Sequence, residues 1–333
     1  MRSVLNINKA IVKTVRFRLA TNQDKNIVLN FCKNTFTWGD YIDRVWDIWI
    51  NEPNSRFLVA ETENTIKKPI GIIHGILIPE NIIWIEGIRI DPEYRKKKIA
   101  TNLINNILDY GRKNGAVYSS AIVSIKNQAS KKMMEKLNFE VVSNWSYIST
   151  AQITYSGKNV VDSKCKLADI DDYQPIVNFL NLENANDFGR TKFVDSWRWY
   201  NMTKDMILNM IYNNQIIVII RKNNKNDSNN NQEIKGLAIL DKERYHYNHN
   251  IFQIGYIDAE SEELISSLVA NSIDLVLNDN RYSKVKNGNL KKIDNRFEKL
   301  QIFTPFREYN FRIFPESYIS FNEQFLLYSK KIE

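Results

Sequence analysis

The stretch WIEGIRIDPEYRKKKIATNLI, residues 84–104, contains three successive kinds of pattern. Its β-branched start, residues 84–90, predicts a strand, and the polar run that follows carries a proline and a series of basic residues. From Ile99 onward apolar residues recur at helical spacing, which predicts an amphipathic helix. Free N–H groups and the positive end of a helix dipole attract anions, so this stretch suits a phosphate group. The alternative is an ordinary strand-to-helix turn with solvated lysines.

The composition indicates a globular protein with room for more than one domain. A chain of 333 residues is long enough for two domains of ordinary size, and its 43% hydrophobic and 12% aromatic content excludes global disorder. No apolar run has transmembrane length, and the first residues lack the apolar segment of a signal peptide. Cys32 and Cys165 match no metal-binding spacing, and three histidines leave little for a histidine-based metal site. We therefore expect a cytoplasmic protein with no metal and no membrane contact.

The net charge of +8 permits an acidic partner, either a nucleic acid or a polyphosphate cofactor. The lysines are spread along the chain rather than gathered in one segment. They also accompany abundant asparagine and isoleucine and few glycines, which indicates a general bias in residue usage. Nucleic-acid binding is therefore the less favoured reading.

Hydrophobic periodicity divides residues 1–150 into strands and helices in the order β-α-α-β-β-β-α-β-α-β. Six strands are predicted, at 15–19, 57–61, 70–78, 82–90, 117–125 and 139–148. Four helices are predicted, at 24–33, 42–50, 99–111 and 127–137.

Three motifs lie at defined places in this order. IDPEY at residues 90–94 leads into RKKKIA at residues 95–100, and Asn127 is followed by EKLNF at residues 135–139. WGDYIDRVWDIWI at residues 38–50 precedes the strand FLVAE. Together they resemble the GCN5-related N-acetyltransferase (GNAT) family, and the third resembles a two-domain subgroup of it. The resemblance implies an α/β (α+β) fold of tandem domains, each a mixed, mainly antiparallel sheet flanked by helices.

The second half resembles a degenerate copy of the first. RLATNQDKNIVLNF at residues 18–31 aligns without gaps to KLADIDDYQPIVNF at residues 166–179. We therefore predict two domains, residues 1–155 and residues 156–333, with a seam within residues 154–162. Where the first half has the basic loop, the second has DAESEELI from Asp258, and its carboxylates would repel a pyrophosphate. We expect the second domain to have the fold without a cofactor loop.

The family resemblance implies acetyl-CoA as the cofactor. The backbone of the strand before the loop would pair with the pantetheine arm, and the loop would hold the pyrophosphate. Carried over by position, the cofactor-binding residues are Ile88, Arg89 and Ile90 for the pantetheine, Arg95, Lys96, Lys97, Lys98, Ile99, Ala100 and Thr101 for the pyrophosphate, and Asn127 near the thiol end.

The loop departs from the family pattern because Lys98 stands where the first loop glycine is expected, and Lys96 where glycine is frequent. Glycine lets the backbone approach phosphates and can supply an unusual φ. A lysine with a helical φ would still donate its N–H while its side chain pointed outward. The alternative is that Lys98 blocks the pocket and the domain is inactive.

Glu86 is the candidate general base, because its strand neighbours other than Arg89 are apolar or glycine and an unpaired carboxylate there needs a reason. The alternative is a structural ion pair with Arg89 or a lysine. The family often has a tyrosine general acid where this chain has Met134, so Tyr118 and Ser124 are candidate substitutes.

The resulting hypothesis is an N-acetyltransferase that moves acetyl from acetyl-CoA to a primary amine by direct attack in a ternary complex. A small molecule or amino acid is the favoured acceptor, and the protein would be a monomer or homodimer. The alternatives are a protein N-terminal or lysine acetyltransferase, and a non-catalytic acetyl-CoA sensor or scaffold.

Overall fold

The computed structural model describes nine segments of the chain, namely residues 15–36, 39–63, 67–150, 165–183, 191–222, 232–241, 251–278, 299–305 and 319–332. The chain divides into two compact units. Unit 1 comprises Met1–Ala121, Lys132–Glu140 and Ser329–Glu333, and unit 2 comprises Ile122–Lys131 and Val141–Tyr328. The predicted seam at residues 154–162 lies outside the described residues, so the boundary between residues 155 and 156 stays a prediction.

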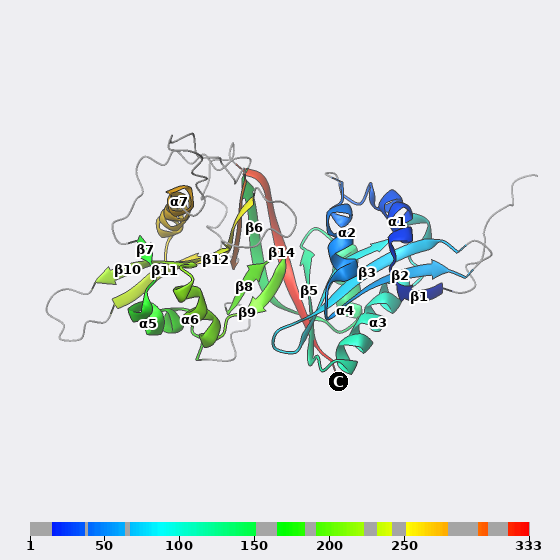
Figure 1. Ribbon diagram of the computed structural model, residues 1–333, viewed down its shortest axis with the longest axis horizontal. Helices are drawn as coiled ribbons and strands as arrows, with labels where there is room; N and C mark the ends of the chain where they lie inside the picture. Colours follow the sequence, from blue (N-terminus) through cyan, green and yellow to red (C-terminus); the bar gives the residue numbers. More distant parts are fainter. Residues whose placement is uncertain are drawn as a thin grey trace, which may run out of the picture. The chain divides into compact units, whose positions relative to one another are not determined.

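Unit 1 contains a mixed sheet in the order β1-β2-β3-β4-β5 (Figure 1). Neighbours are antiparallel from β1 to β4, and β4 and β5 are parallel. The predicted strands and helices of residues 15–136 are all present. Their bounds are β1 Val15–Leu19, α1 Lys25–Cys32, α2 Ile42–Asn51, β2 Ser55–Thr62, β3 Pro69–Ile78, β4 Ile82–Ile90, α3 Ile99–Lys113, β5 Tyr118–Ser124 and α4 Gln128–Lys136.

The helices of unit 1 bury the faces that the sequence pattern predicts. On α2 the apolar side chains at i, i+3, i+4 and i+7 are buried, and the same holds for the stripe on α3. Figure 1 shows α1 and α2 on one face of the β1–β4 sheet and α3 on the other. The buried residues are Ile42, Val45, Trp46 and Trp49 on α2, and Ile99, Leu103, Ile104, Ile107 and Leu108 on α3.

Unit 2 repeats this architecture with a sheet in the order β6-β13-β12-β11-β10-β7. Only β12 and β13 are parallel among its registered pairs. Figure 1 shows α7 on one face of this sheet and α5 and α6 on the other. The bounds are β6 Glu140–Thr150, β7 Cys165–Leu167, α5 Tyr173–Phe179, β8 Lys192–Asp195, β9 Arg198–Asn201, α6 Lys204–Tyr212, β10 Ile216–Lys222, β11 Gln232–Asp241, β12 Ile251–Ala259, α7 Glu262–Asn278, β13 Lys299–Pro305 and β14 Ile319–Lys331.

The segments that align in sequence also share local structure. In unit 1 Asp24 bonds back to the N–H of Thr21 and pairs with Arg18 on β1, with 2.7 Å between the charged atoms. In unit 2 Asp172 bonds back to the N–H of Asp169 and pairs with Lys166 on β7 at 2.8 Å. Both are capping boxes that fix the turn between a strand and a helix. The predicted mixed, mainly antiparallel α/β fold is therefore confirmed.

Each unit contains a strand, or part of one, from the other half of the sequence. In unit 2, β6 pairs with β13 in antiparallel register from Ser149↔Gln301 to Trp145↔Pro305. In unit 1, the end of β14 runs beside β5, where the N–H of Ile332 donates to the carbonyl of Val117 at 2.9 Å. The two units are therefore interleaved along the chain.

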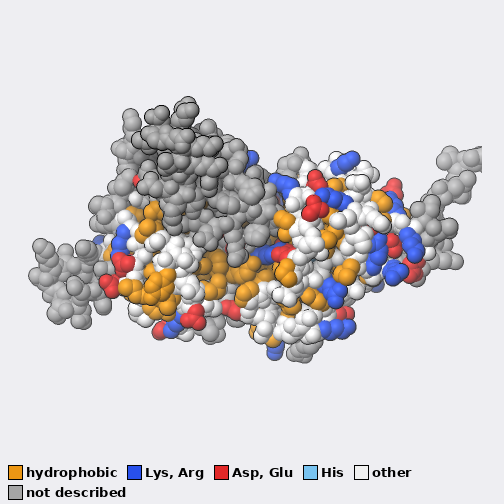
Figure 2. Space-filling view, in the orientation of Figure 1, with side chains coloured by type: hydrophobic (Ala, Val, Ile, Leu, Met, Phe, Trp, Pro, Cys, Tyr) orange, Lys and Arg blue, Asp and Glu red, His pale blue; other side chains and the backbone are white. Residues whose placement is uncertain are grey.

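The charged side chains do not form a single basic patch on the face drawn in Figure 2, where Lys and Arg are dispersed among acidic and polar groups. None of the helices in the described segments is long and apolar enough to span a membrane.

Candidate functional site

The strands β4 and β5 pair only over their first residues. Ile82, Ile83 and Trp84 are in parallel register with Tyr118, Ser119 and Ser120, and no registered pair follows along β4. The remainder of β4, from Ile85 to Ile90, therefore diverges from β5. Because a strand that has left its neighbour presents backbone groups on that side, this fork can pair with an extended ligand.

Two backbone carbonyls in the fork already accept hydrogen bonds from arginine side chains. The carbonyl of Ile88 accepts from Nη1 of Arg89 at 3.0 Å, and the carbonyl of Ile90 accepts from Nε of Arg95 at 3.3 Å. Any ligand arm that pairs with these carbonyls must share them with the guanidinium groups or replace those bonds. The predicted pantetheine contacts therefore lie at polar backbone positions.

The loop after β4 is anchored at its start and basic at its end. The Asp91 carboxylate accepts the N–H of Glu93 at 3.1 Å and pairs with Lys68 at 3.0 Å. This hydrogen bond caps the short 3₁₀ turn Pro92–Tyr94. Downstream of the turn, the side chains of Arg95, Lys96, Lys97 and Lys98 are all exposed.

Lys96 and Lys98 both adopt the left-handed backbone conformation, with φ of 62° at each. The condition of a helical φ at Lys98 is therefore not met, because both lysines take the conformation that glycine favours. Such a residue costs roughly 1–2 kcal/mol relative to its relaxed backbone. The exposed side chain of Lys98 nevertheless points to solvent rather than into the loop. The chain thus keeps the backbone path of a glycine loop without the glycines.

The N-terminus of α3 has no capping side chain. Lys98 is its N-cap residue and makes no side-chain cap hydrogen bond, and the first turn has no acidic residue. The first N–H groups of a helix have no intrahelical partner and carry partial positive charge. Together with four exposed basic side chains, these donors fit a pyrophosphate group.

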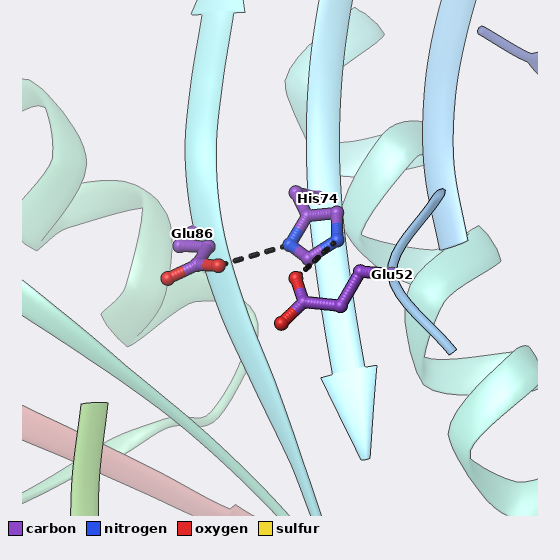
Figure 3. Close-up of side chains that lie close together, drawn as sticks. All are labelled: Glu52, His74 and Glu86. Carbon is purple, nitrogen blue, oxygen red and sulfur yellow. Dashed lines mark hydrogen bonds and ion pairs between the residues drawn. The ribbon is translucent and has the colours of Figure 1, made fainter. Parts of the chain in front are cut away.

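Glu86 lies in a cluster with His74 and Glu52, which we call the Glu–His–Glu cluster (Figure 3). His74 on β3 is directly opposite Glu86 on β4, and its Nδ1 lies 2.9 Å from Oε1 of Glu86. Its Nε2 lies 3.5 Å from Oε2 of Glu52, which follows the end of α2. The His74 side chain is 0% exposed, whereas the carboxylates are 13% and 11% exposed, so only the carboxylates reach solvent.

The imidazole of His74 also stacks against the indole of Trp49. The ring of Trp49 stacks on it with 4.6 Å between centroids and 4° between planes. Trp49 reaches this position because β4 bulges at Gly87, where φ is +68°. A Cβ on Gly87 would lie 2.4 Å from the Trp49 ring, so glycine is required there.

Arg89 forms its ion pair with Asp40, whereas the alternative reading of the sequence paired it with Glu86. Its Nε and Nη2 lie 2.7 and 3.1 Å from the two oxygens of Asp40, a two-point ion pair. The guanidinium lies between the rings of Phe36 and Tyr41, at 4.9 and 5.1 Å. Burial raises the pKa of the Tyr41 phenol, and the guanidinium of Arg89 opposes that rise. The structural ion pair on this strand therefore belongs to Arg89, while Glu86 binds His74.

The other predicted catalytic residues do not join this cluster in unit 1. The register places Tyr118 beside Ile82, which is about 13 Å along β4 from Glu86 at the usual rise per residue. Met134, at the expected position of the family tyrosine, is buried in the core. Among the residues of unit 2, the hydroxyl of Ser124 hydrogen-bonds the carboxylate of Glu323.

Asn127 also belongs to unit 2, where its side chain serves the local backbone. Its Oδ1 accepts the N–H of Ser130 at 3.1 Å, at the start of α4. This is an N-capping contact, so the amide oxygen has a structural role. The assignment of Asn127 to the cofactor stays a prediction.

Sequence reasoning missed Glu52 and Asp40. Glu52 follows α2 immediately before a proline, and Asp40 lies in the connection between α1 and α2. Neither position has a periodic pattern that indicates its partner. Glu52, His74 and Glu86 offer ligand atoms within 4.8 Å of one another, but the two carboxylates meet different nitrogens of one ring. That arrangement suits protons better than a single metal ion, which would bind at one nitrogen.

Comparison with known proteins finds sequence similarity within residues 26–139. The sequence profile described as "Acetyltransferase (GNAT) family" matches residues 26–139. A curated N-acetyltransferase of uncharacterised function from Methanocaldococcus jannaschii is 24% identical over 152 residues, which cover 40% of this chain and 66% of that relative, just under two thirds of its length.

A solved structure shows a similar fold over both units. A GCN5-related N-acetyltransferase from Sphaerobacter thermophilus superposes with a TM-score of 0.57 at 8% identity, covering 96% of each chain. An acetyltransferase from Thermoplasma acidophilum covers 96% of this chain and 95% of its own, at 12% identity and a TM-score of 0.49. The match to the first of these is a likeness of fold and covers both halves of the sequence.

Proposed function

We propose that this protein, whose residues 26–139 belong to the GNAT family of acetyltransferases, binds acetyl-CoA and transfers its acetyl group to a primary amine. The observation that carries the proposal is the fork between β4 and β5, which opens beside an uncapped helix N-terminus. An extended arm that ends in a pyrophosphate matches both features at once. Acetyl-CoA combines these two parts in one molecule.

The loop residues Arg95 to Thr101 would hold the pyrophosphate. The N–H groups at the start of α3 donate to its oxygens, and the helix dipole favours its charge. The exposed side chains of Arg95, Lys96, Lys97 and Lys98 add charge-assisted contacts at the rim. Ile88, Arg89 and Ile90 would present the backbone groups that pair with the pantetheine arm.

Glu86 would act as the general base. When bound, acetyl-CoA supplies a thioester, whose acetyl carbon the amine nitrogen attacks while the carbon–sulfur bond breaks and the sulfur leaves with the electron pair. The carboxylate of Glu86 accepts the proton that the amine nitrogen loses as the carbon–nitrogen bond forms. Its Oε1 lies 2.9 Å from Nδ1 of His74, which fixes one end of the carboxylate. Tyr118 and Ser124 stay as predictions for the group that protonates the sulfur.

A small-molecule or amino-acid acceptor remains the favoured substrate class. The cationic form of such an amine would be attracted to Glu52 and Glu86, whose side chains are both partly exposed. A protein N-terminus or lysine side chain is the alternative acceptor. The cytoplasmic location and a monomeric or dimeric state stay as predictions.

The second domain would have the acetyltransferase fold without a cofactor. The N-terminus of α7 carries Glu262 and Glu263 in its first turn, where α3 carries no acid. Hydrogen bonds from Ser261 and from its own backbone N–H lower the pKa of Glu263, so the carboxylate caps the helix itself. A pyrophosphate at that helix would meet negative charge.

The proposal is tested by an acetyl-transfer assay on the full chain. Wild-type protein and Glu86→Gln are incubated with acetyl-CoA and a panel of amino acids, polyamines and peptides, and free thiol is measured. Calorimetry gives the acetyl-CoA dissociation constant of each protein. We expect transfer by the wild type, a loss of about 100-fold or more in kcat for Glu86→Gln, and unchanged cofactor affinity.

The rival functions give different results in the same assay. A sensor or scaffold would bind acetyl-CoA and acetylate none of the panel. Absence of binding would overturn the proposal altogether. Transfer to peptides but not to free amines would favour the protein acetyltransferase.

A further inference from the structure

The Glu–His–Glu cluster contains more proton-binding groups than a general base needs. Glu86 alone can accept a proton from an amine, yet His74 is fully buried against it and Glu52 lies on the other side of the ring. A buried imidazole N–H needs an acceptor, and the oxygen of Glu86 at 2.9 Å supplies one. The hydrogen bond from the ring therefore decides how the carboxylate of Glu86 is oriented.

A neutral imidazole carries a single N–H and can satisfy only one of the two carboxylates. Its other nitrogen would direct a lone pair toward the second carboxylate oxygen. Nδ1 lies 2.9 Å from Glu86, whereas Nε2 lies 3.5 Å from Glu52 and makes no hydrogen bond among the described residues, so Nδ1 is the nitrogen placed to donate. The indole of Trp49 stacks on the ring with 4.6 Å between centroids and fixes the plane of the imidazole.

We propose that His74 is a positioning residue that donates Nδ1–H to Oε1 of Glu86 and so fixes the orientation of this carboxylate, and that the carboxylate of Glu52 holds the ring from its Nε2 side. This inference rests on the proposed function, because it assigns a role to the neighbours of the proposed base. His74 does not touch the substrate itself, since its side chain is 0% exposed. Its effect on the reaction passes through Glu86.

In unit 2 the positions that correspond to Glu86 and His74 are occupied by apolar residues. The bulge glycine of β12 is Gly255, and the residue before it is Ile254 where unit 1 has Glu86. The partner of Ile254 on β11 is Leu240. Both side chains are buried and apolar, so the strand pair needs no histidine or glutamate to be stable. The polar pair in unit 1 is thus not a requirement of the fold.

Two near-isosteric variants separate the two ring nitrogens. Asparagine places an amide nitrogen as many bonds from the backbone as Nδ1, and glutamine places one as far as Nε2. His74→Asn therefore keeps a donor for Glu86, whereas His74→Gln keeps a donor only on the side of Glu52. We expect kcat within about 3-fold of wild type for His74→Asn and a loss of about 10- to 100-fold for His74→Gln.

Comparing kcat with the melting temperature of the variants distinguishes a role of His74 in positioning Glu86 from a role in packing alone. The KM and dissociation constant for acetyl-CoA and the melting temperature should be alike in the two variants, so that only kcat separates them. Glu52→Gln, on the partly exposed side, keeps an acceptor oxygen and should lose about 3- to 10-fold in kcat, which gives a second test if a His74 variant fails to fold. Equal kcat in His74→Asn and His74→Gln, or full activity in Glu52→Gln, would overturn the inference.

Two controls distinguish a failure of the His74 inference from a failure of the proposed acetyl transfer and from a metal site. If the wild type transfers acetyl and Glu86→Gln does not, the proposed function stands whatever the His74 variants show. Activity lost on dialysis against EDTA and restored by Zn²⁺ would overturn the inference in favour of a metal ion at the three side chains. We expect activity unchanged by EDTA.

Discussion

The forks in the two units begin alike and are filled differently. In unit 1, β4 leaves β5 after Trp84; in unit 2, β12 and β13 pair from Ile251 to Ile254 and then part. The hydroxyl of Thr304 on β13 donates to the carbonyl of Ile257 at 2.7 Å, across the fork of unit 2. Gln253 binds the carbonyl of Val194 in the β8–β9 hairpin at 2.9 Å. In unit 2 a side chain of the same unit, Thr304, therefore bridges the fork.

The helices that follow the two forks, α3 and α7, differ in the groups at their N-termini. The first turn of α3 is uncapped and follows exposed lysines, whereas the first turn of α7 carries its own carboxylates and the Ser261 cap. Such a fold can bind an anion or neutralise itself locally, because the same N–H groups serve either purpose. The comparison teaches that the two units differ by a few side chains at the fork and at the helix that follows it, rather than in their fold.

The largest expected effect comes from Gly87→Ala. A Cβ would lie 2.4 Å from the Trp49 ring at a φ of +68°, so strain and overpacking together should cost about 2–4 kcal/mol of unfolding free energy. Trp49 must move off His74, and kcat should fall with it. The control is Gly115→Ala, where φ is +83° and nothing lies within 4 Å of the new Cβ. Chemical denaturation should show a loss of only about 1 kcal/mol there.

Lys98→Glu makes the start of α3 resemble that of α7. Reversing a charge at an uncapped helix N-terminus should weaken acetyl-CoA binding about 10- to 100-fold, measured by calorimetry at low salt. Lys113→Glu, at the exposed far end of the same helix, makes the identical change of net charge. If both variants bind equally well, the loop is not the pyrophosphate site.

Thr304→Val removes the hydroxyl that spans the fork of unit 2. The buried carbonyl of Ile257 loses its donor, which should cost about 1–2 kcal/mol in thermal or denaturant unfolding. Acetyl transfer should be unchanged, because the change lies in the unit without a cofactor loop. A fall in kcat at normal stability would contradict the assignment of chemistry to unit 1.

Lys98→Gly has the smallest expected effect. It relieves a left-handed backbone, which should stabilise the folded protein by up to about 1 kcal/mol, offset in part by the greater freedom of glycine when unfolded. Acetyl-CoA affinity should change by less than about 3-fold, because the backbone donors keep their places. Binding that appears only in this variant would mean that Lys98 blocks the site.

The elements of the fold were predictable because their apolar periodicity is strong. The faces of α2 and α3 and the strand β4 follow from spacing alone, and Glu86 stood out as a carboxylate among apolar neighbours. The partner of Glu86 was not predictable, because His74 meets it through a register set by the bulge at Gly87. The φ of Lys98 was also beyond prediction, since propensity assigns a left-handed turn to glycine.

Strand partners were the other feature that the sequence did not specify. An alternating pattern predicts that β6 and β14 are strands, but any sheet edge can accept such a pattern. The structure pairs β6 with β13 and the end of β14 with β5. The last residues of β14 therefore belong to unit 1, and β6 from Val141 onward belongs to unit 2.

The exchange of β14 has a consequence for synthesis of the protein. At ordinary elongation rates, the roughly 180 residues from the end of β6 to Ile332 take about 10–40 s to leave the ribosome. During that interval the outer edge of β5 lacks the strand that covers it, including the bond from Ile332 to Val117. A nascent chain in this state presents an open sheet edge, the kind of surface that chaperones protect. Acetyl transfer should therefore begin only after translation has passed β14, and a message truncated before it should yield no active half.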